Sequence, residues 1–194
     1  QVFSDAIRRG DLKTAVYLAE RPAGQLAYRE VSVWQRLAEK QIETGDRESA
    51  SDSYGKASLA VGRISSSANI YFFDIQSVVR LAESMLRHGM KEEGRRTLLL
   101  VQPLLERISE RRIDDRIKAS IAVAEPLSRL GMRSEAKRLI RQAYFYAHSY
   151  DTERLHGDME KARLLASIGQ SISLYSKLGS SKSQEGITTF PPKK

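Results

Sequence analysis

Three glycines, Gly45, Gly89 and Gly131, stand in the same local pattern, and this repetition constrains the fold more than any other feature of the chain. An alanine lies seven residues before each glycine, and a small residue lies five residues after it. The alanines are Ala38, Ala82 and Ala124, and the small residues are Ala50, Gly94 and Ala136. Because glycine ends a helix in a left-handed conformation at little steric cost, this spacing predicts a repeated helix–turn–helix unit.

The first copy, residues 34–57, is the most complete. Apolar and small residues recur at helical spacing on both sides of Gly45, and Asp46 is placed to cap the second helix. Small side chains are expected where two helices cross closely. The residues that define the repeats are Trp34, Leu37, Ala38, Gly45, Ala50, Tyr54 and Ala57 in the first copy, Leu81, Ala82, Gly89 and Gly94 in the second, and Ala124, Gly131 and Ala136 in the third.

At these residues the chain resembles the tetratricopeptide-repeat superfamily. The Trp-x-x-Leu opening, the turn glycine and the Ala–aromatic–Ala series of residues 34–57 carry the resemblance, which covers roughly residues 3–150. The later copies depart from the family pattern, since Val78 and Ser120 stand at the tryptophan position. Successive turn glycines, starting from Gly10, lie 35, 44 and 42 residues apart, against about 34 in the family. A HEAT-like or unclassified α-solenoid is the alternative.

The resemblance implies an all-α, right-handed solenoid of antiparallel helix hairpins, with about three full repeats and partial end units. We expect a single helical-repeat domain at residues 1–179 and a flexible tail at residues 180–194. Within the domain we expect a partial unit at 1–27, repeats at about 28–66, 70–112 and 114–150, and a terminal helix at 152–178. Pro103 is expected to kink or restart the helix that begins at Lys91. The apolar cluster of residues 70–73 is expected to pack in the core, with ligand binding as the alternative.

Composition fits a folded protein, with 41% hydrophobic and 29% charged residues, and the net charge of +8 favours acidic partners. The absence of cysteine excludes disulfides, zinc thiolate sites and thiol catalysis. No apolar run approaches the roughly 18 residues of a membrane span. The first residue, Gln1, suggests a trimmed boundary or a mature terminus after signal removal. The compartment stays open, with the cytoplasm favoured over the periplasm or export.

No catalytic or metal-binding motif is visible, so we expect neither an enzyme nor a bound cofactor. The three histidines, His88, His148 and His156, lack the spacing of a helical metal site, and there is no glycine-rich phosphate loop. Tyrosines at 144, 146 and 150 lie near Arg138 and Arg141, a combination that can hold single-stranded nucleic acid. Tyrosines at even spacing point around a helix, however, and packing is the simpler interpretation.

In tetratricopeptide proteins the first helix of each repeat lines a concave groove. By resemblance, the groove residues are Gln35, Glu39, Glu43, Gln76, Val79, Glu83, Arg87, Lys118, Glu125 and Arg129. The glutamates could hold a basic or amide-rich peptide, although Glu83–Arg87 and Glu125–Arg129 could equally pair within their own helices.

Our leading hypothesis is therefore a non-catalytic scaffold that binds a protein segment in this groove. A basic nucleic-acid binder and a structural subunit of a larger envelope or secretion assembly are the alternatives. A homodimer through a terminal helix is also conceivable.

Overall fold

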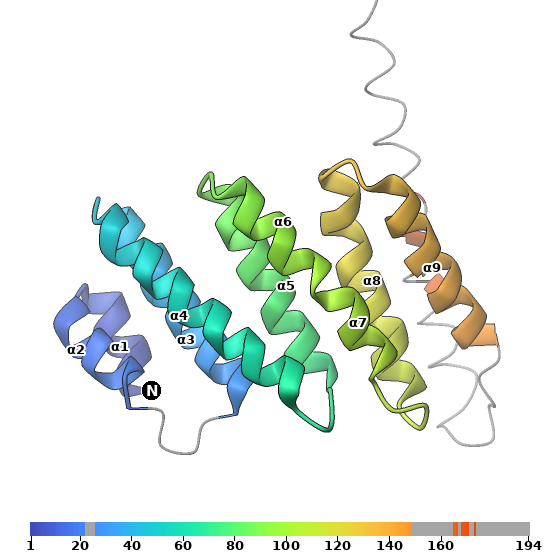
Figure 1. Ribbon diagram of the computed structural model, residues 1–194, viewed down its shortest axis with the longest axis horizontal. Helices are drawn as coiled ribbons and strands as arrows, with labels where there is room; N and C mark the ends of the chain where they lie inside the picture. The colour runs from blue at the N-terminus through green and yellow to red at the C-terminus, as the bar shows by residue number, and fades with distance from the viewer. Residues whose placement is uncertain (22–25, 149–164, 167, 171–172, 174–194) are drawn as a thin grey trace, which may run out of the picture.

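The computed structural model describes residues 1–21, 26–148, 165, 166, 168–170 and 173, and these residues form helices and no strands (Figure 1). The all-α prediction is therefore confirmed. The helices are α1 (Val2–Arg9), α2 (Leu12–Ala19), α3 (Ala27–Glu43), α4 (Arg47–Ser66), α5 (Phe72–Arg87), α6 (Lys91–Leu99), α7 (Val101–Glu106), α8 (Ile113–Arg129) and α9 (Arg133–His148).

Tight turns join α1 to α2, α3 to α4, α5 to α6 and α8 to α9. Each of these turns contains a glycine with positive φ directly at or after the C-cap of the first helix, and the four values lie between 74° and 85°. After α3, the backbone N–H of Gly45 donates to Ile42 O at 3.0 Å, and that of Asp46 donates to Gln41 O at 2.8 Å. The same two bonds recur at the other three turns. These bonds give the last carbonyls of the first helix a hydrogen-bond donor. They require a residue in the left-handed conformation, which glycine adopts without steric cost, and this explains why a glycine stands in each turn.

Side-chain caps strengthen the start of two second helices. Asp11 accepts a hydrogen bond from the backbone N–H of Thr14, and Asp46 accepts one from that of Ser49, each at 3.1 Å. The expected N-cap at Asp46 is therefore present. Both caps satisfy amide groups that have no partner within their helix.

The two helices of each pair pack against one another, and the small residues of the repeat lie between them. Contacts join α3 to α4, α5 to α6 and α8 to α9. The alanines seven residues before the turn glycines are completely buried, as Ala38, Ala82 and Ala124 show. In the facing helices, Ala50 and Ala136 are buried to the same degree. The absence of larger side chains lets the helices approach closely.

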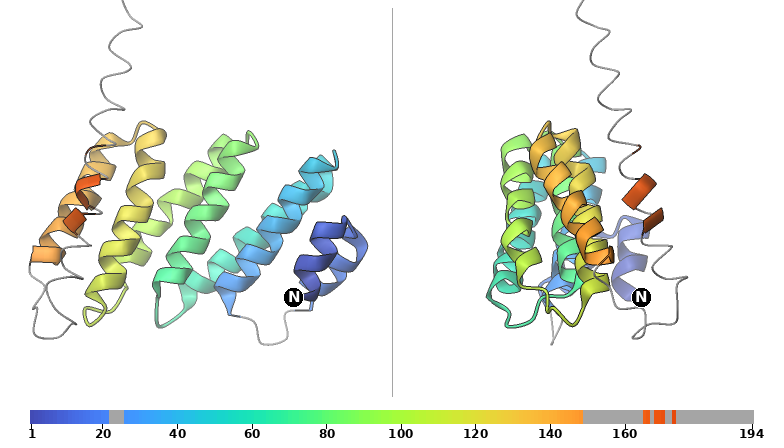
Figure 2. Two further views of the ribbon diagram at one scale, coloured as in Figure 1. Left: turned by 180° about the vertical axis from the view of Figure 1, so that it is seen from behind. Right: turned by 90° about the vertical axis from the view of Figure 1, so that its right-hand side faces the viewer.

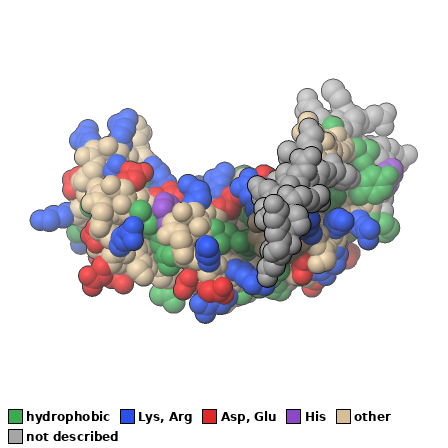
Figure 3. All heavy atoms as spheres, turned by 90° about the horizontal axis from the view of Figure 1, so that it is seen from above, with side chains coloured by type: hydrophobic (Ala, Val, Ile, Leu, Met, Phe, Trp, Pro, Cys, Tyr) green, Lys and Arg blue, Asp and Glu red, His purple; other side chains and the backbone are tan. Residues whose placement is uncertain are grey.

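Neighbouring pairs contact each other mainly where α2 packs on α3, α3 on α5, and α5 on α8, so the last two of these junctions join the first helices of successive pairs. The ribbons show α3, α5 and α8 in one layer and α4, α6, α7 and α9 in the other (Figures 1 and 2). Seen from above, the molecular surface is hollowed between its two ends (Figure 3).

The helix expected from Lys91 to about residue 111 is broken in two. The first part, α6, ends at Leu99, and α7 starts at Val101 with Pro103 in its first turn. Proline has no N–H to donate to the carbonyl four residues earlier, so it is tolerated only in the first turn of a helix. The new helix begins two residues before Pro103, which places the proline in that turn. The second part ends at Glu106, and Ile108 then forms an isolated bridge with Ile70. The expected terminal helix 152–178 and tail 180–194 lie mostly outside the described residues.

Candidate functional site

The ten predicted groove residues lie on three helices of one layer. Gln35, Glu39 and Glu43 lie on α3, Gln76, Val79, Glu83 and Arg87 on α5, and Lys118, Glu125 and Arg129 on α8. Gln35 and Val79 are buried, whereas the other eight side chains keep contact with solvent. The exposed part of the predicted set is therefore largely charged.

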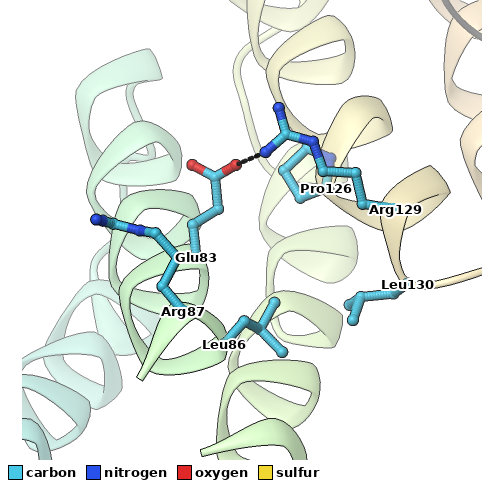
Figure 4. A pocket seen from close by; sticks show the side chains of 6 residues that line it. All are labelled: Glu83, Leu86, Arg87, Pro126, Arg129 and Leu130. Carbon is cyan, nitrogen blue, oxygen red and sulfur yellow. Dashed lines mark ion pairs between the residues drawn. The ribbon is translucent and has the colours of Figure 1, made fainter. Parts of the chain in front are cut away.

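A pocket of about 490 Å³ lies between the C-terminal ends of α5 and α8 (Figure 4). Its lining combines three predicted groove residues with three apolar side chains: Glu83, Arg87 and Arg129 with Leu86, Pro126 and Leu130. The Glu83 carboxylate points across the pocket toward the Arg129 guanidinium, whereas Arg87 points toward the preceding helices. The resemblance to tetratricopeptide repeats brought the three charged residues into the predicted set, and all three line this one pocket.

Ion pairs on this layer connect neighbouring hairpins. A carboxylate oxygen of Glu39 lies 3.2 Å from the Arg87 guanidinium, and one of Glu83 lies 3.5 Å from that of Arg129. Both glutamates lie six residues before their turn glycine and both arginines two residues before theirs. The contact is thus repeated at equivalent positions. The pairing of Glu83 with Arg87 considered from the sequence is absent, but Glu125 does pair with Arg129, at 2.5 Å.

A buried polar network joins α3, α4 and α5 behind the first of these pairs. The hydroxyl of Ser84 donates to Glu39 at 2.6 Å and lies 2.7 Å from the hydroxyl of Tyr54. Nδ1 of His88 lies 2.9 Å from the same Tyr54 oxygen and 2.8 Å from the backbone carbonyl oxygen of Ser84. Three helices therefore share one set of hydrogen bonds.

The directions of these hydrogen bonds follow from their partners. A carbonyl oxygen only accepts, so Nδ1 of His88 carries the proton and donates to Ser84 O. The Tyr54 hydroxyl then donates to the Ser84 hydroxyl, which donates in turn to the Glu39 carboxylate. Burial raises the pKa of Tyr54, while its hydrogen bond with the Ser84 hydroxyl acts in the opposite direction. Tyr54 therefore stays neutral and serves as a donor in the core.

A second cavity, of about 560 Å³, opens on the other side of Arg87, between α4 and the end of α5. The sequence interpretation gave His88 a structural or exposed role and did not consider Arg47, yet both residues line this cavity. Arg47 follows a turn glycine by two residues and His88 precedes one by one. Sequence position next to two successive turns is the signal that could have linked them, because equivalent turns lie at the same end of adjacent hairpins.

The apolar cluster of residues 70–73 divides between core and surface. Ile70 is buried, Phe72 is half-buried, and Tyr71 and Phe73 are exposed. Phe73 stacks on Tyr28 with the ring centroids 6.0 Å apart. The two exposed residues, Tyr71 and Phe73, line a pocket of about 360 Å³. The alternative that this cluster binds a ligand therefore concerns these two residues.

The tyrosines near the end of α9 do not form one platform. Tyr144 is exposed, and its ring centroid lies 4.3 Å from that of His148. Tyr146 is half-buried, and its hydroxyl accepts a hydrogen bond from Gln142 at 2.9 Å. The guanidinium of Arg116 lies over the Tyr146 ring. The two rings therefore have separate surroundings. Tyr150 and His156 lie outside the described residues.

Comparison of the chain with protein-family models, with curated proteins and with solved structures found no match. Within the described ranges, no three His, Asp or Glu side chains are grouped so that they could hold a metal ion. None of the helices in the described part of the chain has both the length and the apolar character needed to cross a membrane.

Proposed function

We propose that this protein is a non-catalytic adaptor, a tetratricopeptide-like right-handed solenoid that binds a peptide or protein segment on the layer of α3, α5 and α8. The observation that carries the proposal is the pocket between α5 and α8. The resemblance to tetratricopeptide repeats selected Glu83, Arg87 and Arg129 as groove residues, and all three line this pocket.

Equivalent geometry in successive hairpins supports the solenoid. The four turns share one hydrogen-bond pattern and one glycine conformation. The ion pairs Glu39–Arg87 and Glu83–Arg129 then repeat one contact between neighbouring units. Stacked hairpins of this kind present an extended surface, which suits an elongated partner better than a small substrate.

The lining of the pocket indicates which partner segment would fit. Leu86 and Leu130 are half-buried and Pro126 is buried, so a side chain inserted between them would remove apolar surface from water. Glu83 and Arg129 at the rim offer an acceptor and donors. A segment with an apolar anchor next to a polar or charged residue would satisfy both parts.

Affinity capture from the native source tests the proposal, with the immobilised wild type compared with two variants. Glu83→Lys reverses the charge at the pocket. Glu92→Lys makes the same change on α6, in the other layer and at an exposed position, and is the matched control. We expect a specific protein to be retained by the wild type and by Glu92→Lys and to be lost from Glu83→Lys, while all three proteins keep the same helical circular dichroism.

Two outcomes would contradict the proposal. Equal retention by both variants would remove the α5–α8 pocket from the binding surface. Recovery of nucleic acid that is released by moderate salt would favour the basic nucleic-acid binder instead, since phosphate contacts weaken steeply with salt.

A further inference from the structure

The lining of the cavity between α4 and the end of α5 includes two arginines and a histidine but no carboxylate. Its volume is about 560 Å³. The charged lining residues are Arg47, from the first turn of α4, and Arg87, from the last turn of α5, with His88 next to it. The remaining lining residues are Ile42, Ala50, Ser51, Tyr54, Gly89 and Met90. A cavity with this composition favours an anion.

The two guanidinium groups keep most of their donors available. Arg47 has no ion-pair or hydrogen-bond partner for its side chain in the described part of the chain. Arg87 contacts Glu39 through Nη2 alone, at 3.2 Å. A guanidinium carries five N–H donors in a planar fork that matches the oxygens of a phosphate. Arg87 can therefore hold Glu39 and still donate into the cavity.

His88 presents its second nitrogen. Nδ1 is occupied by Ser84 O and the Tyr54 hydroxyl, at 2.8 and 2.9 Å. The ring is thus fixed by α4 and α5, and Nε2 has no partner among the described residues. When the imidazole is protonated, Nε2 becomes a charged donor that can face an anion.

Two of the carboxylates that lie near the cavity in the sequence have other partners. Glu43 pairs with Lys40 at 2.8 Å, and Asp46 caps α4 by accepting from Ser49 N–H at 3.1 Å. Only the carboxylate of Glu39 contacts a charged lining residue, and it is also held by the hydroxyl of Ser84. The positive charge of Arg47 is therefore uncompensated by direct contact.

We infer that this cavity is a binding site for a phosphoryl group, held by the guanidinium groups of Arg47 and Arg87 and, when the imidazole of His88 is protonated, by its Nε2–H. The site is separate from the docking surface proposed above and shares only Arg87 with the α5–α8 pocket. Phosphate binding here does not depend on docking there. A phosphorylated polypeptide and free phosphate offer the same chemistry.

The test is an amide chemical-shift titration of the full chain in phosphate-free buffer at constant ionic strength. One arm uses inorganic phosphate, and the other a short Gly–Ser peptide with one phosphoserine, with the unphosphorylated peptide as reference. We expect saturable shifts centred on Ser51, Gly89 and Met90. Tighter binding of the phosphopeptide would identify a phosphorylated chain as the ligand, and equal or tighter binding of phosphate would identify the free anion.

Two variants and a matched control locate the site. Arg47→Gln should weaken binding about tenfold, because a charge-assisted hydrogen bond is lost. His88→Asn keeps a donor where Nδ1 lies but removes Nε2, and should also weaken binding. Arg63→Gln makes the same change on α4, away from the cavity, at a residue that pairs with Glu30, and should leave binding unchanged.

The absence of a saturable shift in the wild type would overturn the inference. Equal weakening by Arg47→Gln and Arg63→Gln would overturn it as well, because that result would reveal attraction by net charge alone. Neither result would affect capture of a protein through the α5–α8 pocket, so the two proposals fail independently.

Discussion

The hydroxyl oxygen of Tyr54 lies 2.7 Å from that of Ser84, and this contact joins α4 to α5 inside the core. Both side chains are almost completely buried. Tyr54→Phe removes the hydroxyl and leaves the Ser84 oxygen without its donor, while Ser84 still donates to Glu39. We expect a loss of about 1–2 kcal/mol in the free energy of unfolding, measured by urea denaturation.

Tyr28→Phe is the matched control for that measurement. The Tyr28 hydroxyl accepts one exposed hydrogen bond, from Arg29 Nε at 3.2 Å. Water can replace this donor, so the variant should unfold at nearly the same urea concentration as the wild type. If both variants lost the same stability, the buried network would have no special role in joining the hairpins.

Glu83 pairs with Arg129 of the next hairpin and not with Arg87 of its own helix, and this gives a second prediction. In a double-mutant cycle, Glu83 and Arg129 should show a coupling energy of about 0.2–1 kcal/mol, small because solvent screens both side chains. Glu83 and Arg87 should show none, since Arg87 contacts Glu39 instead. The cycle is measured on the free energy of unfolding with Glu83→Gln, Arg87→Gln and Arg129→Gln. Coupling in the second pair but not in the first would contradict the observed register.

The buried carboxyl of Asp74 should make stability depend on pH. Burial raises its pKa above 3.8, although the backbone N–H of Tyr71, which donates to Asp74 at 2.8 Å, acts in the opposite direction. The folded state therefore holds the proton more tightly than the unfolded state as the pH rises above 3.8. As the pH rises from 3.8 through the folded-state pKa, the wild type should lose stability relative to Asp74→Asn. Thermal unfolding of both proteins at a series of acidic pH values measures this difference.

Asp11 gives the opposite sign in the same experiment. The hydrogen bonds from Thr14 lower its pKa below 3.8. Its unfolded state binds the proton more tightly, so the wild type should lose stability relative to Asp11→Asn as the pH falls below that value. Identical pH profiles for the two variants would show that neither carboxyl is perturbed by its local contacts.

The turns and the small interface residues could be predicted because both depend on local rules. Gly45, Gly89 and Gly131 end their helices as expected, since a left-handed residue is required at a fixed distance from the last helical carbonyls. The buried alanines followed from counting residues away from those glycines.

The contacts between hairpins could not be predicted, because they depend on how neighbouring hairpins align. Glu83 has an arginine four residues later in its own helix, yet it pairs with Arg129 on α8. The network of Glu39, Tyr54, Ser84 and His88 joins three helices, and no motif marks it. The predicted groove set contained Glu83, Arg87 and Arg129 of the α5–α8 pocket, whereas Arg47 and His88 of the cavity between α4 and the end of α5 were not predicted as site residues.

The close approach of α5 and α6 explains why Gly94 stands where the other copies have alanine, and it yields a fourth prediction. A Cβ added at Gly94 would lie 2.7 Å from Leu86 Cγ and 2.9 Å from the carbonyl oxygen of Ala82. Alanine favours a helix more than glycine does, but here the backbone would have to move apart. We expect Gly94→Ala to lower the free energy of unfolding by about 1–3 kcal/mol.

Gly55→Ala provides the matched comparison in α4, where an added Cβ meets nothing within 4 Å. That variant should gain about 0.4–1 kcal/mol from higher helix propensity and a less flexible unfolded chain. Chemical denaturation of the two variants side by side measures both effects. If Gly94→Ala were as stabilising as Gly55→Ala, then α5 and α6 would not be in close contact at this position, and the small residue after the turn would reflect backbone propensity instead of packing.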